Sequence, residues 1–280
     1  MNMWQGILLG LVQGLTEFLP VSSSAHLVAA KHLLNVQQPG VALEVALHAG
    51  TLGAILAVLW RDVLALVTDA LRGGLLLLRG AGAEAIEERA PLFGTAAAVV
   101  VGTIPAAVIG VLAGDAIGGL FDNLAAAGAF LCCTGAILLA SRTIRPGTRE
   151  RVTIGRGLAV GAAQAMALLP GLSRSGITIV AGRAAGLDRR LAGRFSFLLA
   201  VPALTGAAVW EVLRSLGTQS PAAGPPVTAG ALAAGVLVSG LTGGLALIVL
   251  LRMIERGRLH WFAAYCLPAG LAMLLAGLSG

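Results

Sequence analysis

Two polar segments decide how this chain folds. Residues 13–26 read Gln-Gly-Leu-Thr-Glu-Phe-Leu-Pro-Val-Ser-Ser-Ser-Ala-His, and residues 164–178 read Gln-Ala-Met-Ala-Leu-Leu-Pro-Gly-Leu-Ser-Arg-Ser-Gly-Ile-Thr. Each segment has a Gly three residues before its Gln, a Pro a few residues after it and a Ser nine residues after it. Together they bring a carboxylate, an imidazole, a guanidinium and many hydroxyls into a chain of mostly Ala, Leu, Gly and Val. This gathering of polar groups indicates a chemical site.

The composition is that of an integral membrane protein. Hydrophobic residues make up 57% of the 280 residues and charged residues 11%, against about a quarter charged in an average soluble domain. The mean hydropathy is +0.90 and the sequence pI is near 10.5. Because the basic residues fall mainly between apolar spans, they indicate membrane orientation and not nucleic-acid binding. We expect one membrane domain over residues 1–280, with no cleaved signal peptide.

Apolar spans of membrane-crossing length predict an all-α fold with six transmembrane helices. The predicted spans are 43–60, 93–113, 123–141, 195–213, 228–251 and 260–278. The two polar segments lie inside apolar stretches at about 3–30 and 157–182, each broken by Pro, Gly and Ser. Broken backbone at membrane depth must be buried in protein or line a wet cavity, so each stretch is interpreted as a re-entrant helical hairpin.

The basic residues predict the orientation. Most of the 19 Lys and Arg residues lie in the predicted loops 61–92, 142–156, 183–194 and 252–258, and the loops 114–122 and 215–227 contain none. With the basic loops in the cytoplasm, both termini fall outside. The first hairpin then enters from outside and the second from the cytoplasm.

The halves 1–141 and 157–280 therefore run in opposite senses, as in an inverted-topology repeat, whose site is expected near the midplane. Pro105 and Pro202 each lie inside a predicted transmembrane helix. They are either a second pair of equivalent positions in the two halves or ordinary helix kinks. The pairs Gly110/Gly114 and Gly240/Gly244 have the spacing that packs membrane helices, either within one chain or in a homodimer.

The first hairpin carries groups suited to phosphate chemistry. Gln13 and Glu17 are four residues apart and share one helix face. An ionisable residue at membrane depth marks a functional site by default, although Glu17 could instead bond backbone amides at the break. Ser22, Ser23, Ser24 and His26 follow Pro20 at an expected helix start, where free amides attract an anion. The alternative for these serines is simple N-capping.

The second hairpin carries a guanidinium that cannot lose its charge. At membrane depth Arg174 requires an anionic partner. It either pairs with Glu17 as a structural contact or binds phosphate oxygens through two of its nitrogens. The hydroxyls of Ser173, Ser175 and Thr178 beside it favour phosphate.

These two segments resemble the signature regions of the bacterial undecaprenyl-diphosphate phosphatase family (UppP, also called BacA), and the similarity runs along the full chain. The resemblance implies a multi-pass enzyme of the bacterial inner membrane with a site open to the periplasm or outside. Its substrate is the membrane lipid undecaprenyl diphosphate, whose terminal phosphate it removes to recycle the lipid carrier of peptidoglycan synthesis. The resemblance also implies bacitracin resistance and a divalent cation, Mg²⁺ or Ca²⁺, as cofactor.

Matched residue by residue, the resemblance assigns catalytic roles to Glu17, Ser23, His26 and Arg174. It assigns phosphate binding to the following residues: Gln13, Ser22, Ser24, Ser173, Ser175 and Thr178. Metal binding falls to Glu17, with Gln13 as a second candidate. This sequence departs from the family pattern at Ala25, which is usually Gly, and at His48, which is usually Gln. His48 is either a neutral substitute for Gln or an additional titratable group. Glu44 and His48 are accessory candidates. Gln13 in place of a first Glu leaves one negative ligand fewer.

The mechanism that these residues indicate is in-line attack on the terminal phosphorus by Ser23. His26 or Glu17 takes its proton, while Arg174 and a divalent ion stabilise the phosphoryl charge. A metal-bound water held by Glu17 and aimed by His26 is the alternative.

Three other protein classes use parts of the same pattern. A transporter of phosphorylated polyprenyl lipid would share the inverted repeat. A phosphatase of the vanadium-haloperoxidase-like type needs a further His after its Ser-Arg pair, and none follows Arg174 before His260. A purely structural membrane protein would leave the buried polar groups without a purpose.

Overall fold

A computed structural model of the chain describes residues 1–34, 36, 42–217 and 228–279. The described residues form α-helices joined by short turns and 3-10 segments. The helices are α1 (Met3–Phe18), α2 (Ser23–Leu33), α3 (Ala42–Val58), α4 (Trp60–Leu78), α5 (Ala83–Arg89), α6 (Phe93–Gly118), α7 (Leu124–Ala140), α8 (Ile154–Met166), α9 (Arg174–Ala184), α10 (Arg189–Gly217), α11 (Ala229–Glu255) and α12 (Ala263–Ser279), with 3-10 segments η1 (Gly119–Asp122), η2 (Ser141–Thr143) and η3 (Leu259–Phe262).

The helices confirm the predicted all-α membrane class. Five are long and apolar enough to cross a membrane: those within 93–122, 124–143, 189–213, 229–255 and 259–279. A sixth span results if α3 and α4 are taken as one span that bends by 81° between Val58 and Trp60. These counts refer to the described part of the chain, and they agree with six predicted spans.

The prediction of an irregular loop over residues 61–92 was wrong. This stretch contains α4 and α5, and α6 extends five residues beyond the predicted span. Its arginines obscured a helical period, since Leu64, Leu71, Leu75 and Leu78 recur along an exposed stripe of α4. Of the predicted outer loop 215–227, residues 218–227 lie outside the described residues.

Small residues let the helices of the two motif segments approach other helices closely. α1 packs along α11 and α8 packs along α6. A Cβ atom on Gly10 would lie 2.2 Å from the carbonyl oxygen of Gly235, and one on Gly161 would lie 2.0 Å from that of Gly102. Backbone contact of this kind is how membrane helices associate without a hydrophobic driving force. These contacts fix where each motif begins.

The two predicted glycine pairs have different surroundings within the chain. A Cβ on Gly240 would lie 3.1 Å from the carbonyl oxygen of Gly50, so Gly240 packs α11 against α3. Gly110 and Gly114 face open space and line a pocket. Gly240 thus packs helices within the chain, whereas the role of Gly110 and Gly114 in helix packing stays a prediction.

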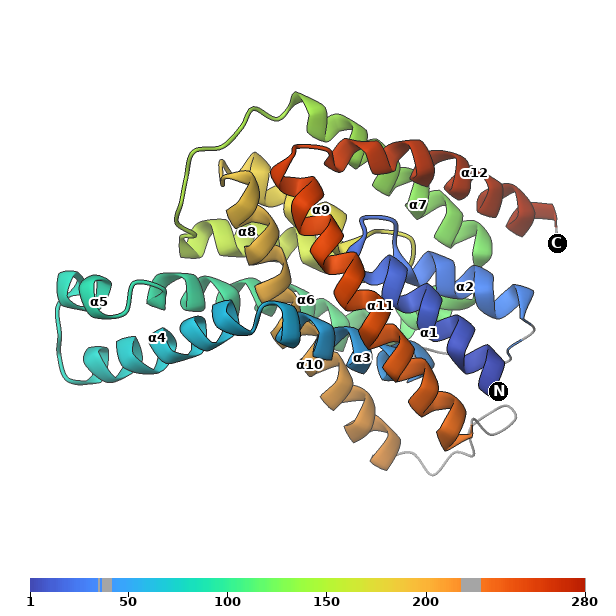
Figure 1. Cartoon of the computed structure of the whole chain (residues 1–280), viewed down its shortest axis with the longest axis horizontal. Coiled ribbons are helices and arrows are strands. Elements are labelled where there is room, and N and C mark those ends of the chain that lie inside the picture. Colours follow the sequence, from blue (N-terminus) through green and yellow to red (C-terminus); the bar gives the residue numbers. More distant parts are fainter. Residues whose placement is uncertain (35, 37–41, 218–227, 280) are drawn as a thin grey trace.

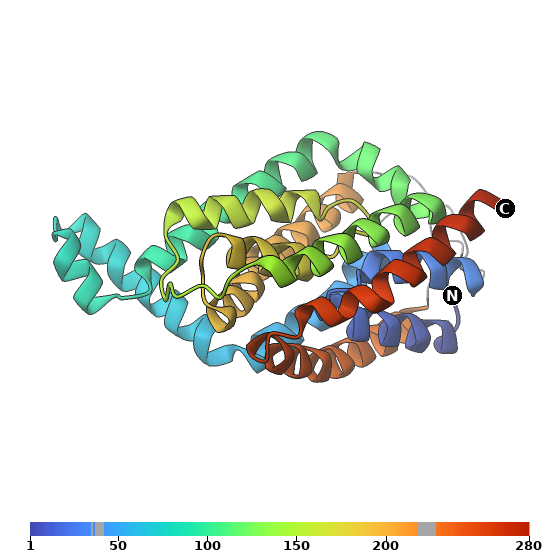
Figure 2. The same cartoon turned by 90° about the horizontal axis from the view of Figure 1, so that it is seen from above.

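The bundle has two distinct ends (Figures 1 and 2). α4 and α5 project from one end, and both termini lie at the other. Between them, the buried rings of Phe18 on α1 and Phe197 on α10 meet edge to face with centroids 5.8 Å apart. Phe18 follows Glu17 directly, so this core contact anchors the C-terminal end of α1 where the polar residues begin.

Candidate active site

The first polar segment turns sharply between α1 and α2. Ser22 is the N-cap of α2, where its side chain accepts a hydrogen bond from the amide of Ala25. Its φ of 66° makes it the single non-glycine residue with positive φ in the described chain. Such a conformation is strained for a residue with a Cβ, and strained residues cluster at functional sites. The turn makes Ser23 the first residue of α2 and brings its hydroxyl back toward α1.

The second polar segment makes a comparable turn between α8 and α9. Gly171 has φ 106°, and a Cβ there would lie 2.3 Å from the carbonyl oxygen of Ala127, so the position requires glycine. Ser173 caps α9 by accepting a hydrogen bond from the amide of Gly176 at 3.2 Å. N-capping, the alternative given for the serines of the first segment, therefore holds for Ser22, and Ser173 caps α9 in the same way. Arg174 is consequently the first residue of α9.

The two turns meet each other. The amide of Gly171 donates to the hydroxyl of Ser24 at 3.1 Å. Thr134 on α7 holds the second turn, because its hydroxyl donates to the carbonyl of Gly171 at 2.8 Å and accepts from the amide of Ser173 at 2.9 Å. Sequence reasoning missed Thr134, since a lone Thr in an apolar helix carries no signal of this contact.

Glu17 is the centre of the joined segments: it accepts three hydrogen bonds from protein groups and lies beside a fourth group, the imidazole of His48. Its Oε2 accepts from Gln13 Nε2 at 3.0 Å and from the Ser23 hydroxyl at 2.6 Å, and lies 3.1 Å from His48 Nε2. Its Oε1 accepts from Arg174 Nη2 at 2.5 Å. The Glu17 side chain is 5% exposed and that of Arg174 14%, so the ion pair is screened little by water. Glu17 and Arg174 thus form the predicted pair.

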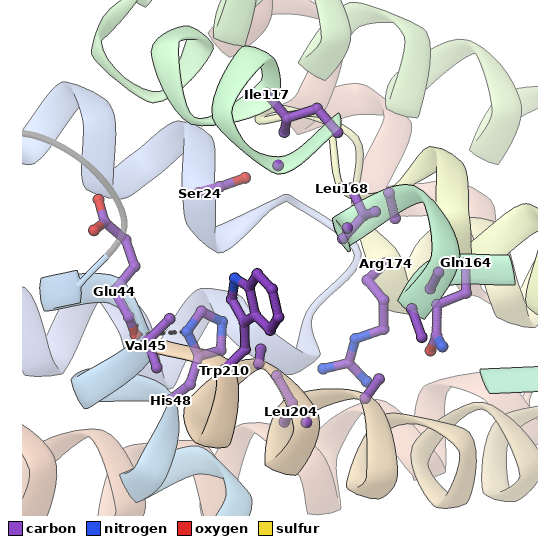
Figure 3. Close-up of a pocket in the computed structure, with 18 of the residues that line it drawn as sticks. Ser24, Glu44, Val45, His48, Ile117, Gln164, Leu168, Arg174, Leu204 and Trp210 are labelled. Carbon is purple, nitrogen blue, oxygen red and sulfur yellow. Dashed lines mark hydrogen bonds between the residues drawn. The ribbon is translucent and has the colours of Figure 1, made fainter. Parts of the chain in front are cut away.

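A pocket of about 420 Å³ opens beside this pair (Figure 3). Its polar end comprises the side chains of both motifs, and its walls are mostly small or apolar residues of α6 and α10. Polar lining residues are Glu17, Ser22, Ser23, Ser24, Glu44, His48, Thr103, Gln164, Ser173, Arg174 and Glu211, and wall residues include Ala106, Ala107, Gly110, Gly114, Ile117, Gly118, Phe121, Ala203, Leu204, Gly206, Ala207 and Trp210. Such a cavity fits a ligand with a polar head and an apolar chain.

The accessory candidates lie on α3 at the pocket edge. His48 Nδ1 is 2.5 Å from the carbonyl oxygen of Glu44, so this nitrogen carries the hydrogen and Nε2 faces Glu17. The Glu44 carboxylate lies 2.8 Å from Lys31 Nζ, and both side chains are buried. Lys31 also lies 3.7 Å from Asp122 of η1. Glu44 is thus paired with a cation outside the catalytic cluster.

Several predicted residues do not line the pocket. His26 directs Nδ1 to the carbonyl of Ser22 at 2.8 Å and Nε2 to the hydroxyl of Tyr265 at 2.6 Å. The ring of Tyr265 also stacks on His26, a contact across 239 residues that sequence reasoning missed. Thr178 bonds the carbonyl of Arg174 at 2.7 Å and the hydroxyl of Ser196 at 2.6 Å, while Ser175 contacts Ser173. Their predicted roles, and the base role of His26, stay predictions.

The donor set does not form a metal site by itself. Both oxygens of Glu17 already accept hydrogen bonds from protein groups, and the side-chain nitrogen of Gln13 is one of the donors. Among the described residues, no group of three or more His, Cys, Asp or Glu could hold a metal ion. Mg²⁺ is commonly bound by one or two carboxylates together with substrate phosphates. The expected cation accordingly lacks a resident site built by protein groups alone.

Comparisons with known proteins agree with the motifs. The model of the bacitracin resistance protein BacA family matches residues 6–272. The undecaprenyl-diphosphatase of Desulforapulum autotrophicum is 36% identical over 282 residues, covering 99% of both chains. The proteins of the same name from Desulfatibacillum aliphaticivorans and Thermomicrobium roseum are each 40% identical, and the alignments cover 99% and 98% of both chains.

Proposed function

The chain belongs to the BacA family, and from this membership and the site geometry we infer that it is an undecaprenyl-diphosphatase. It hydrolyses undecaprenyl diphosphate in the membrane to undecaprenyl phosphate and inorganic phosphate. One observation carries the chemistry: the Ser23 hydroxyl donates to Glu17 at 2.6 Å, which is the distance of a nucleophile from its base. The pocket supplies a polar end for the diphosphate and an apolar wall for the start of the polyprenyl chain.

We propose that Ser23 attacks the terminal phosphorus while Glu17 takes its proton. The bond between phosphorus and the bridging oxygen breaks, undecaprenyl phosphate leaves, and a phosphoserine remains. Glu17 then releases that proton to solvent. Water attacks the phosphoserine and gives a proton to Glu17, which passes it to the Ser23 oxygen as inorganic phosphate leaves. Arg174 offsets the charge of the phosphoryl oxygens, and its second nitrogen, Nη1, has no partner in the described chain.

His48 rather than His26 is the imidazole that touches Glu17. We propose that His48 orients the Glu17 carboxylate, since its Nδ1 is tied to the backbone of its own helix and its Nε2 faces Oε2. Gln13 supports the same oxygen from α1. His26 as the base remains the alternative drawn from the sequence, and it requires the ring to leave Tyr265 and Ser22. The contact between the Ser23 hydroxyl and Glu17 favours Glu17 as the proton acceptor, because the Nε2 atom of His26 is bonded to Tyr265 instead.

The expected divalent cation, Mg²⁺ or Ca²⁺, is proposed to enter with the substrate. A diphosphate brings its own oxygen ligands, so it can carry the ion into a site that lacks a complete set of protein ligands. In this proposal the ion belongs to the substrate complex, and no step of the chemistry above depends on a metal-bound water. The metal-bound water mechanism stays the alternative.

We propose that the two halves form an inverted repeat with two re-entrant hairpins. In this repeat α1 corresponds to α8, α6 to α11 and α7 to α12. The packing supports it, because α1 contacts α11, α8 contacts α6, and α7 contacts α12. Such exchanged contacts are what a two-fold relation between halves requires. Each hairpin turns at a positive φ, at Ser22 or near Gly171.

The site is proposed to open to the periplasm or outside, where both termini also lie. The pocket wall continues to Gly118 and Phe121, at the predicted outer loop 114–122. The termini and the arginine-bearing α4 lie at opposite ends of the bundle (Figure 1), in line with a cytoplasmic position for the basic stretch. The homodimer stays a prediction.

The testing experiment measures phosphate release from a long-chain prenyl diphosphate by purified protein in detergent, with and without chelator. Wild-type release that is lost in both Glu17→Ala and Arg174→Ala supports the proposal. Unchanged rates in both variants would refute it. Detergent also separates hydrolysis from transport, because a protein that only moves lipid from one membrane face to the other releases no phosphate when it is dissolved in detergent.

A further inference from the structure

Gln164 occupies the polar end of the pocket without any partner for its amide. The residue is 3% exposed, and neither Nε2 nor Oε1 has a hydrogen-bond partner in the described chain. It lines the same pocket as Arg174, and Figure 3 shows the two residues on the same side of the cavity. Buried amides in folded proteins almost always find a partner, because leaving one unpaired is costly. A buried, unpaired amide on a residue that lines a pocket therefore indicates a ligand.

Arg174 presents a second unpaired donor to this space. Its Nη2 bonds Glu17, while its Nη1 is buried without a partner in the described residues. Arg174 is also the first residue of α9, whose N-terminal dipole favours an anion. A guanidinium nitrogen, an amide and a helix N-terminus together form a donor set suited to an oxyanion and not to an apolar chain.

The two motif glutamines differ in what they bond. Gln13 and Gln164 stand at equal positions in the two segments, and both are buried. Gln13 donates to Glu17 at 3.0 Å, whereas Gln164 bonds nothing in the described chain. The first glutamine is committed to holding the carboxylate. The second is free for the substrate.

We propose that Gln164, with Nη1 of Arg174, binds a phosphoryl oxygen of the diphosphate. This assignment rests on the proposed function, since the ligand is the diphosphate that the enzyme hydrolyses. The amide turns its NH₂ group toward the oxygen, so Gln164 is a substrate-binding residue and takes no part in proton transfer. It helps to hold the headgroup while Ser23 attacks.

The test compares Gln164→Leu and Gln164→Glu with wild type, measuring KM and kcat for a prenyl diphosphate and the melting temperature in detergent. Leu keeps a similar volume and removes an unpaired polar group, so the melting temperature should hold or rise. KM should increase about tenfold to a hundredfold, the range expected for one lost hydrogen bond to a charged group. Gln164→Glu should lose more, because its carboxylate repels the diphosphate.

Thr242→Val is the matched control. Thr242 lies on α11 and is not among the residues that line the pocket, and its hydroxyl already donates to the carbonyl of Val238 at 2.7 Å, so its loss should leave KM unchanged. An unchanged KM in Gln164→Leu would overturn the assignment. So would a Gln164→Leu protein that melts much earlier or fails to fold, because the amide would then have a structural partner. A wild-type protein that releases no phosphate would overturn the proposed function instead.

Discussion

Replacing Ser23 by Ala tests the covalent mechanism most directly. The substitution removes the hydroxyl that lies 2.6 Å from Glu17 Oε2. Glu17 keeps its contacts with Gln13, His48 and Arg174, so the fold should lose only about 1.5 to 3 kcal/mol, the contribution of one hydrogen bond to a charged group. Activity should fall far more, because removing a nucleophile typically costs on the order of 10³-fold or more in kcat.

The assay follows phosphate release and, separately, acid-quenches the enzyme with substrate labelled in its terminal phosphate. Wild type should yield labelled protein, and Ser23→Ala should yield none. Ser239→Ala is the control for stability, since this buried hydroxyl donates to the carbonyl of Leu47 at 3.0 Å away from the pocket. It should melt about as early as Ser23→Ala and keep full activity. Activity in Ser23→Ala within about tenfold of wild type would refute a serine nucleophile and favour a metal-bound water.

Three further predictions concern the surroundings of Glu17. Arg174→Lys keeps the charge, but an ammonium cannot bond Glu17 and a phosphate in one plane as a guanidinium does, so kcat/KM should fall about 100-fold in steady-state assays. A fall under threefold would contradict the proposal that Arg174 bonds both groups. His48→Ala should lower kcat more than His26→Ala in the same assays, because only His48 touches Glu17; the reverse order would restore His26 as the base. Gly171→Ala should cost about 3 kcal/mol, measured as a lower melting temperature, because the new Cβ meets the Ala127 carbonyl at 2.3 Å and φ is 106°; an unchanged melting temperature would show that the turn can relax.

The sequence was sufficient for the membrane class and for naming Glu17, Ser23 and Arg174, which the structure brings into contact, as candidates. Helix spans follow from runs of apolar residues, which are local in sequence. Glu17, Ser23 and Arg174 were identifiable because polar groups at membrane depth are rare and costly. α4 was missed because four charged residues, Arg61, Asp62, Asp69 and Arg72, lie among its apolar residues and indicate a loop when they are counted without regard to the helical period.

Residues without an unusual local context required the tertiary structure. Thr134 and Tyr265 are ordinary members of apolar helices, and only packing brings them to Gly171 and His26. The unpaired state of Gln164 likewise depends on which side chains surround it. Contacts across 37 and 239 residues leave no trace in local spacing.

Of the two ring nitrogens of His26 and His48, one has a partner that the local sequence determines and the other has a partner that the tertiary structure determines. His26 and His48 make the same local bond, each directing Nδ1 to the carbonyl four residues earlier in its helix. That bond follows from helix geometry, so the sequence determines it. The partner of each Nε2 depends on helix packing: His26 meets Tyr265 and His48 meets Glu17. A hydrogen bond requires placement to within a few tenths of an ångström, and here that placement is set by close contacts between helices, such as Gly10 against Gly235.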